Sequence, residues 1–343
     1  MFTIRTAIEQ LIQKHDLSAE EMRAVMWAIL SGSVSAAQLG GFLVAMRMKG
    51  ETVEELVTAA KVLKELVLPV EIDTDSLLDI VGTGGDHSHT FNISTCSAFV
   101  VAAAGGRIAK HGSIAVSSRS GSVNVLEAAG INLTLTPQEI AYCIQELGLG
   151  FMYASHHHTA WKHAANPRKE LGIRTFFNLI GPLINPANVK RQVVGVFDRH
   201  WVFPIAQVLQ QLGSERAMVV NAEDGLDEIS INLPTQVAEL KNNQITVYTL
   251  TPEQFGLTRA PLDSLKVNSA VESLAIIEQV LQNVPGPARD IIALNAGAAI
   301  YVAGLADNLQ EGVAKAFAVL ADGSAYKKLL ALRELTQKLS ATK

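Results

Sequence analysis

Residues 77–95 run LLDIVGTGGDHSHTFNIST, and this stretch decides the fold. Apolar side chains dominate its beginning, glycines cluster between Gly82 and Gly85, and Asn92 introduces an apolar segment of helical character. Glycines directly after a strand let the backbone take positive φ angles and come close to a ligand. The helix start that follows offers free N–H groups and a partial positive charge, which favour a phosphate group. The stretch predicts a strand, a tight turn and a helix that together could bind phosphate.

An alternative for this turn stays open. Glycine-rich turns between strands and helices are common, and Asn92 or Ser94 could serve only as the N-cap of the helix. The segment lacks the Gly-Lys-Ser/Thr ending of a P-loop, and it does not match the G-x-G-x-x-G pattern of dinucleotide-binding proteins. Taken alone, the turn does not decide between phosphate binding and simple capping.

Short apolar runs and helical stretches follow one another from residue 77 to about residue 221. Repeated strand–helix–strand units of this kind form a largely parallel sheet that is covered by helices. Residues 181–186 (GPLINP) are expected to form a loop or crossover, and the alanine-rich tail from Ala270 is expected to be helical and to pack on the sheet. The predicted fold class is α/β, with a mostly parallel central sheet.

The first part of the chain has a different pattern. Apolar residues recur there at helical spacing, Ser18 with Glu21 forms a capping-box pattern, and Pro69 ends the helical run. We therefore expect a small helical domain followed by a larger α/β domain. The predicted bounds are 1–70 for the helical domain and 71–343 for the α/β domain, with part of 160–190 packed against the helical domain.

The composition restricts the class of protein. The chain has 343 residues, of which 48% are hydrophobic, so it can build a large core. Its formal net charge of −5 gives no basic surplus for binding nucleic acid or an anionic membrane, and its most apolar stretch, 98–106, is too short to span a bilayer. Cys96 and Cys143 show no metal-ligand spacing, and the first residues do not resemble a signal peptide. We expect a cytoplasmic protein with neither nucleic acid nor membrane as a partner.

Two further loops are predicted to meet the glycine turn. Lys110-His111-Gly112-Ser113 follows another apolar run, and residues 117–122 (SSRSGS) place hydroxyl groups and a glycine ahead of the next helix. In a parallel α/β fold the carboxyl ends of neighbouring strands face the same crevice. Backbone N–H groups, hydroxyls and one ammonium group would then surround a ligand with several phosphate oxygens.

An acidic pair supplies candidate metal ligands. Asp227 and Glu228 follow Asp224-Gly225, which is typical of a turn. Magnesium prefers oxygen ligands and commonly combines a few carboxylates with phosphate oxygens and water. Adjacent residues of a regular strand point to opposite faces, so both carboxylates serve one site only from a turn, unless they serve different ions. An acidic turn on the surface, without a metal, is the alternative.

Several motifs together resemble the anthranilate phosphoribosyltransferase family, and the resemblance covers nearly the whole chain. In chain order they are residues 82–86 (GTGGD), 90–95 (TFNIST), 110–112 (KHG), 168–175 (RKELGIRT), 177–183 (FNLIGPL) and 224–230 (DGLDEIS). The resemblance implies a helical domain joined to a larger α/β domain, as in pyrimidine nucleoside phosphorylases, and usually a homodimer. It also implies a Mg2+-dependent reaction of phosphoribosyl pyrophosphate with anthranilate, which gives phosphoribosyl anthranilate and pyrophosphate in tryptophan biosynthesis.

The resemblance further implies roles for individual residues, position by position. Those that would hold phosphoribosyl pyrophosphate are Gly82, Gly85, Asp86, Thr90, Asn92, Ser94, Thr95, Lys110, Ser118 and Ser122. Those that would serve the magnesium are Ser94, Asp227 and Glu228, and those that would border anthranilate are Gly82, Ser113, His158 and Arg168. No residue is assigned as a general acid or base, because an aromatic amine is neutral near pH 7 and needs positioning and later loss of a proton.

The residues near the predicted anthranilate site could also have purely structural roles. Arg168 could be an ordinary arginine on a helix surface, and His158 and Trp161 could serve only in core or interface packing. The run His156-His157-His158 is not expected to bind a metal, because consecutive histidines do not share a face and magnesium avoids imidazole.

The chain departs from the family after Lys110-His111-Gly112, where Asn-Arg is usual and Ser113-Ile114 is present. Serine is shorter than asparagine, and isoleucine has neither charge nor hydrogen-bonding capacity. The departure leaves two alternatives open: a transferase acting on another aromatic amine or a nitrogen heterocycle, and a non-catalytic binding paralogue. A nucleoside phosphorylase is disfavoured by the acidic pair and by the residues before Ser113.

Overall fold

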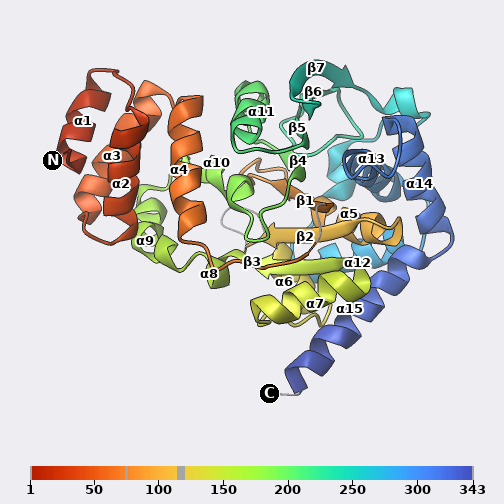
Figure 1. Ribbon diagram of the computed structural model, residues 1–343. Helices are drawn as coiled ribbons and strands as arrows, with labels where there is room; N and C mark the ends of the chain where they lie inside the picture. Colours follow the sequence, from red (N-terminus) through yellow and green to blue (C-terminus); the bar gives the residue numbers. More distant parts are fainter. Residues whose placement is uncertain (1, 74–75, 114–119, 342–343) are drawn as a thin grey trace.

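The computed structural model describes residues 2–73, 76–113 and 120–341, and it begins with a helical bundle (Figure 1). The bundle consists of α1 (Ile4–Ile12), α2 (Ala19–Leu30), α3 (Ala36–Lys49) and α4 (Val53–Glu65). Ser18, Ser35 and Thr52 begin α2, α3 and α4 as capping boxes, in which each side chain accepts a hydrogen bond from the backbone three residues later. The predicted small helical domain is confirmed, and its end at residue 70 stays a prediction.

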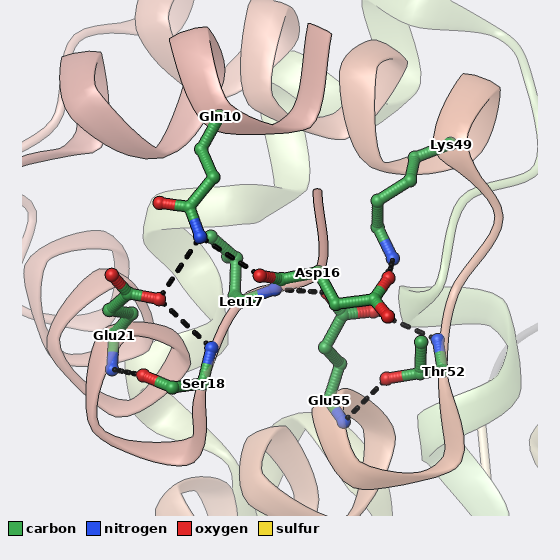
Figure 2. A network of polar contacts seen from close by, with 8 residues as sticks. All are labelled: Gln10, Asp16, Leu17, Ser18, Glu21, Lys49, Thr52 and Glu55. Carbon is green, nitrogen blue, oxygen red and sulfur yellow. Dashed lines mark hydrogen bonds and ion pairs between the residues drawn. The ribbon is translucent and has the colours of Figure 1, made fainter. Parts of the chain in front are cut away.

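A network of polar contacts ties two turns of this bundle together (Figure 2). The Glu55 carboxylate accepts hydrogen bonds from the backbone N–H groups of Leu17 at 2.9 Å and Thr52 at 2.8 Å. Lys49 Nζ lies 2.9 Å from Glu55 Oε2 and 2.7 Å from Asp16 Oδ1. The side chains of Lys49 and Glu55 are only 3% and 1% exposed, so a matched ion pair is buried where the α1–α2 and α3–α4 turns meet.

One seven-stranded sheet follows, in the order β3-β2-β1-β4-β5-β6-β7. Its strands are β1 (Leu77–Gly82), β2 (Arg107–Gly112), β3 (Leu149–Tyr153), β4 (Arg191–Gly195), β5 (Arg216–Ala222), β6 (Thr235–Lys241) and β7 (Gln244–Leu250). Pairing is parallel from β3 across to β5, and β6 and β7 join antiparallel. The predicted α/β class with a mostly parallel sheet is confirmed, whereas β3 and the β6–β7 hairpin were not among the predicted strands.

Alternate residues of the strands face two different cores. Val193 of β4 packs in a core with α5 (Ile93–Ala103) and α13 (Pro287–Val302). Its neighbour Val194 packs in a second core, which contains α10 (Phe177–Ile180), α11 (Val202–Gln211) and the buried side chains of α1–α4. Because side chains alternate along a strand, the sheet buries both faces, and one of them shares its apolar interior with the helical domain.

The other α-helices lie around these cores (Figure 1). They are α6 (Ser122–Ala128), α7 (Pro137–Leu147), α8 (Ala154–His157), α9 (Lys162–Leu171), α12 (Ala270–Leu281), α14 (Leu309–Ala321) and α15 (Ser324–Ala341). Helix α9 contacts α2 and α3, so this segment of the chain lies against the helical domain. Residues 181–184 form a 3-10 helix with Pro182 in its first turn, within the stretch where a loop or crossover was expected. Across the described ranges, no helix is both long and apolar enough to cross a membrane.

Candidate active site

The glycine turn lies at the carboxyl end of β1. Gly84 and Gly85 have φ angles of +67° and +78°, in the left-handed region that favours glycine. At Gly82 the requirement is space, because an added Cβ atom would lie 2.4 Å from Asp227 Oδ2. Asp86 follows and accepts a hydrogen bond at 3.3 Å from the backbone N–H two residues later. The glycines thus serve two purposes, a sharp turn and a close approach to a carboxylate.

The acidic pair reaches this turn from the segment between β5 and β6. Gly84 N donates a hydrogen bond to Asp227 Oδ2 at 2.8 Å, and Ser94 N in the first turn of α5 donates to Glu228 Oε1 at 3.2 Å. The backbone of Asp227 lies directly against Gly195 at the end of β4, where a Cβ atom would come within 1.5 Å of the Asp227 carbonyl oxygen. Asp227 is 8% exposed. Both carboxylates therefore point from one segment toward the glycine turn and the start of α5, and this acidic segment is not an exposed surface turn.

Lys110 extends from β2 to the same place. Its Nζ donates hydrogen bonds to Ser94 Oγ at 3.1 Å and to the carbonyl oxygen of Ile80. The side chain is buried, and burial lowers the pKa of Lys110, opposed by nearby carboxylates of which Asp79 has the largest effect. The ends of β1 and β2, the start of α5 and the acidic segment thus converge in the structure.

Carboxyl groups outnumber amino groups among these side chains. Burial raises the pKa of Asp227 to about 7, with a further contribution from the charge of Asp86. Burial also raises the pKa of Glu228 to about 8, with a further contribution from Asp227. The part of the chain that the structure describes contains no group of three or more His, Cys, Asp or Glu residues arranged to hold a metal. Two carboxylates fit Mg2+, which completes its shell with phosphate oxygens and water.

Asn92 occupies the N-cap position of α5, but its side chain makes no hydrogen bond to the N–H groups of that helix. Its Oδ1 accepts hydrogen bonds from Ser120 Oγ at 2.8 Å and Ser273 Oγ at 2.7 Å, and its Nδ2 donates to the carbonyl oxygen of Ser120 at 3.0 Å. Asn92 therefore ties Ser120, just before α6, to Ser273 of α12. The Ser94 hydroxyl accepts a hydrogen bond from Lys110 and lies inside the helix, so Ser94 is not the N-cap, whereas Asn92 is the N-cap residue by position without a capping hydrogen bond from its side chain.

The other residues predicted on the donor side are placed as follows. Thr90 lies at an isolated β-bridge just before α5, and the buried hydroxyl of Thr95 has no hydrogen-bond partner within the described ranges. Ser122 begins α6, and its Oγ donates a hydrogen bond to the carbonyl oxygen of Ser113 at 3.4 Å. Two residues named above, Ile114 and Ser118, lie outside the described residues.

A cluster of rings lies near the end of β2. The rings of His111 and His158 have centroids 5.0 Å apart, and the ring of Trp161 lies 6.0 Å from that of His158. The guanidinium carbon of Arg168 lies 5.4 Å from the centroid of Trp161 and 5.0 Å from that of Phe177. Arg168 is half-buried, so it is not an ordinary helix-surface arginine. Two successive residues of β2 therefore belong to different groups of side chains. Lys110 lies with the acidic pair, and His111 lies with the rings.

The cluster contains one cation, Arg168, and two neutral histidines, His111 and His158. Burial lowers the pKa of His158 to about 4 and that of Arg168 to about 10, and it places the pKa of His111 well below its usual range. At pH 7 Arg168 stays charged and both histidines are neutral. The Nε2 atoms of His111 and His158 are buried without a hydrogen-bond partner among the described residues. A planar aromatic carboxylate fits such surroundings, because arginine binds carboxylates and stacks on rings.

Arg174, Asp79 and Asn185 were not assigned from the sequence. Arg174 Nη2 donates a hydrogen bond to the carbonyl oxygen of Gly85, and its guanidinium carbon lies 4.4 Å from the ring centroid of Phe197. Asn185 Nδ2 donates to Asp79 Oδ2 at 2.7 Å, and burial raises the pKa of Asp79 to about 6. An aspartate inside an apolar strand was a signal for a buried partner, but the sequence did not identify that partner.

Comparison with known proteins covers both domains. Residues 5–67 match the helical bundle domain of a glycosyl transferase family, and residues 74–326 match the a/b domain of the glycosyl transferase family. Anthranilate phosphoribosyltransferase from Methylococcus capsulatus is 57% identical to this chain over 99% of both, and that from Thioalkalivibrio sulfidiphilus is 54% identical over 97% of this chain and 98% of the relative.

Solved structures agree with these relatives. The crystal structure of anthranilate phosphoribosyltransferase from Thermus thermophilus matches with a TM-score of 0.91 and 42% identity, over 96% of this chain and 99% of that chain. The Saccharomyces cerevisiae enzyme, in complex with PRPP and Mg, matches with a TM-score of 0.90 and 26% identity over 98% of both chains. With two matched domains and full-length relatives at this level of identity, the chain belongs to the anthranilate phosphoribosyltransferase family.

Proposed function

We propose that this chain transfers the phosphoribosyl group of phosphoribosyl pyrophosphate to anthranilate, giving N-(5-phosphoribosyl)anthranilate and pyrophosphate in tryptophan biosynthesis. The observation that carries the proposal is the convergence of the glycine turn, the start of α5, Lys110 and the acidic pair at one end of the sheet. Family membership supports the same reaction, since the full-length relatives bear the name of this enzyme.

The donor is held at the carboxyl ends of β1 and β2. Backbone N–H groups of the glycine turn and of the first turn of α5 bind its phosphate oxygens, together with the ammonium group of Lys110. The residues assigned to the donor are Gly82, Gly85, Asp86, Thr90, Asn92, Ser94, Thr95, Lys110, Ser118 and Ser122. Ser94, Asp227 and Glu228 would hold Mg2+, which when bound neutralises negative charge on the pyrophosphate.

The reaction breaks the bond between the ribose C1 carbon and the pyrophosphate oxygen. Pyrophosphate leaves with the bonding electron pair, positive charge develops on the ribose, and the amino nitrogen of anthranilate forms the new bond to C1 before it loses a proton. Lys110 and the N–H groups at the start of α5 stabilise the negative charge that develops on the leaving group. Since the amine is neutral near pH 7, orientation of the two substrates replaces a general base.

The acceptor lies beside the rings. Arg168 binds the anthranilate carboxylate, while its guanidinium lies against the neighbouring rings of Trp161 and Phe177 and His158 lines the same side. Ser113 borders the acceptor at the end of β2, and Gly82 borders both substrates because it lies at the end of β1 against Asp227.

The homodimer is a further part of the proposal. Ile12 and Met48 are 69% and 78% exposed and lie at the ends of α1 and α3, two helices that pack against each other. Large exposed apolar side chains suit an interface between two copies. Light scattering should give twice the chain mass of 36.8 kDa, and a monomer at micromolar concentration would reject this part. The cytoplasmic location stays a prediction.

A fluorescence assay tests the reaction. With phosphoribosyl pyrophosphate and Mg2+ present, the fluorescence of anthranilate should fall as the protein consumes it, and no loss under any condition would reject anthranilate as the acceptor.

Combining Asp227→Asn with Glu228→Gln should lower turnover by at least about 100-fold, because the metal and its charge are lost. The melting temperature should hold or rise, since burial already disfavours the charged form of both carboxyls. Asp263→Asn, on a carboxylate 82% exposed, is the matched control, and near-normal turnover in the double variant would contradict the metal assignment.

A further inference from the structure

Asn295 is a fully buried amide in the middle of α13, which is otherwise apolar around it. Its Oδ1 accepts a hydrogen bond from Ile229 N at 2.9 Å, and its Nδ2 donates to the carbonyl oxygens of Ile229 and Ile291, both at 2.9 Å. One side chain thus binds both backbone polar groups of Ile229, a residue 66 positions away in the chain. A buried amide that is this fully paired specifies one position for the backbone it contacts.

Ile229 directly follows Glu228, and the segment from 223 to 234 belongs to no helix or strand. Backbone groups in such a segment have no ladder to fix them and need other partners when they are buried. The next residue is held as well: Ser230 N donates to Thr235 Oγ1 at 3.0 Å, and Ser230 Oγ donates to Asp224 Oδ2 at 2.7 Å. Asn295 adds an anchor from α13, which lies far along the chain from this segment.

The acidic pair needs such an anchor. Two carboxylates that share a buried site repel each other, and their desolvation adds to that cost. On one side Gly195 lets β4 lie directly against the backbone of Asp227, and on the other side α13 holds Ile229 through Asn295. The pair is therefore fixed between a strand and a helix, with its carboxylates facing the glycine turn and the start of α5.

We propose that Asn295 is a positioning residue for the metal-binding acidic pair: through the backbone of Ile229 it fixes where Asp227 and Glu228 present their oxygens to Mg2+. This inference rests on the proposed function. Mg2+ requires nearly ideal octahedral geometry. A small displacement of its carboxylate ligands therefore weakens the binding of Mg2+ more than it weakens the contacts to the organic substrates. Loss of a group that orients metal ligands typically lowers the affinity for the metal by about 10–100-fold.

Asn295→Leu removes the hydrogen bonds and keeps the number and branching of the side-chain heavy atoms. Calorimetry in the presence of phosphoribosyl pyrophosphate should show Mg2+ affinity reduced by about 10–100-fold, and the Mg2+ concentration for half-maximal rate should rise by a similar factor. The KM for anthranilate should stay within about twofold, because the rings and Arg168 do not depend on α13. Asn295→Ser, a smaller change, serves the same test if the leucine variant does not fold.

Thr336→Val is the matched control. Thr336 is 1% exposed in α15, its Oγ1 accepts a hydrogen bond from Asn132 N at 3.2 Å, and it donates to the carbonyl oxygen of Arg333 at 3.1 Å. This variant also loses buried hydrogen bonds, so its melting temperature should fall while its Mg2+ affinity remains that of the wild type. If the Asn295 variants lose melting temperature and keep wild-type Mg2+ affinity, the residue is only structural and the inference is overturned.

Hydrogen exchange gives a second measurement on the wild-type protein. The amide of Ile229 should exchange as slowly as amides of the core strands, and in Asn295→Ser it should exchange at least about 10-fold faster. Fast exchange of this amide in the wild type would overturn the inference. A wild-type protein that consumes no anthranilate would overturn the proposed function, whereas an active wild type with unaltered Mg2+ dependence in the variants overturns only the role of Asn295.

Discussion

The burial of His158 imposes a pH dependence on stability. Its pKa falls from 6.5 to about 4 in the folded protein because burial disfavours the charged ring, so folding favours the neutral form. The stability that comes from keeping His158 neutral is fully present above pH 6.5 and is lost as the pH falls toward 4. At pH 5 the free energy of unfolding is lower by about 2 kcal/mol for this reason. Urea unfolding at pH 7 and pH 5 should show a smaller loss in His158→Gln than in the wild type. His15→Gln, at an exposed position, is the control, and equal losses in all three proteins would contradict the role of burial.

Gly195 is required for the place of Asp227. A Cβ atom at Gly195 would lie 1.5 Å from the Asp227 carbonyl oxygen, and the nearest partner is backbone, which cannot rotate away. Gly195→Ala should destabilise the protein by about 1–3 kcal/mol and weaken calorimetric binding of phosphoribosyl pyrophosphate with Mg2+. Gly40→Ala in α3 is the matched control, since its Cβ atom would meet only Leu171 at 3.9 Å and helix propensity favours alanine. Retained donor binding in Gly195→Ala would show that the acidic segment is not held at β4.

At the scale of single residues, the sequence predicted the kinds of residue in the site but not their partners. Gly84 and Asp227 are 143 positions apart, and Arg174 lies 89 positions from Gly85. Glycine, lysine and paired carboxylates have chemistry that can be recognised in isolation. The partner of Arg174 depends on how the segment after α9 folds back over the sheet, and nothing local in the sequence specifies that.

Elements were predicted where local rules decide them. The helices of the first domain begin at capping boxes, which involve residues only three positions apart. The β6–β7 hairpin was missed although a signal was present: Asn242 and Asn243 connect the strands with φ angles of +52° and +58°, and asparagine is favoured in such two-residue turns. Strand β3 is a short apolar run after Gly148, and such a run does not distinguish a buried strand from a helix segment.

The buried pair in the helical domain should contribute more to stability than an exposed pair in the same domain. Glu55→Gln leaves Lys49 buried and facing Asp16, whose side chain is 65% exposed, so a loss of about 3 kcal/mol in the free energy of unfolding is expected. Glu65→Gln breaks the pair with Arg23, in which the side chains are 43% and 47% exposed, and should cost less than about 1 kcal/mol. Urea denaturation compares the two. Equal effects would mean that the contacts in Figure 2 are not protected from solvent.

At the scale of the whole molecule, the boundary predicted from the sequence does not separate the apolar interiors. Side chains of α1–α4 belong to the same core as Val194 and Val219, on one face of the sheet, and α10 and α11 fill the space between. Pro69 and the change of pattern near residue 70 mark where the chain leaves the bundle. They do not reveal that later segments return to it, because that contact joins parts of the chain more than 100 residues apart.

A shared core predicts that the helical domain does not unfold by itself. The three tryptophans allow a direct test, because Trp27 lies in α2 and Trp201 is buried beside α11. In variants that retain only Trp27 or only Trp201 of the three, fluorescence should report the same urea midpoint, as expected for one cooperative transition. Adding Glu55→Gln, which disturbs only the helical domain, should lower both midpoints equally, since a core that spans both parts transmits the loss to the whole. An earlier transition at Trp27 with Trp201 unmoved would instead describe two domains of independent stability, and the division at residue 70 would then be a boundary of unfolding as well as of sequence pattern.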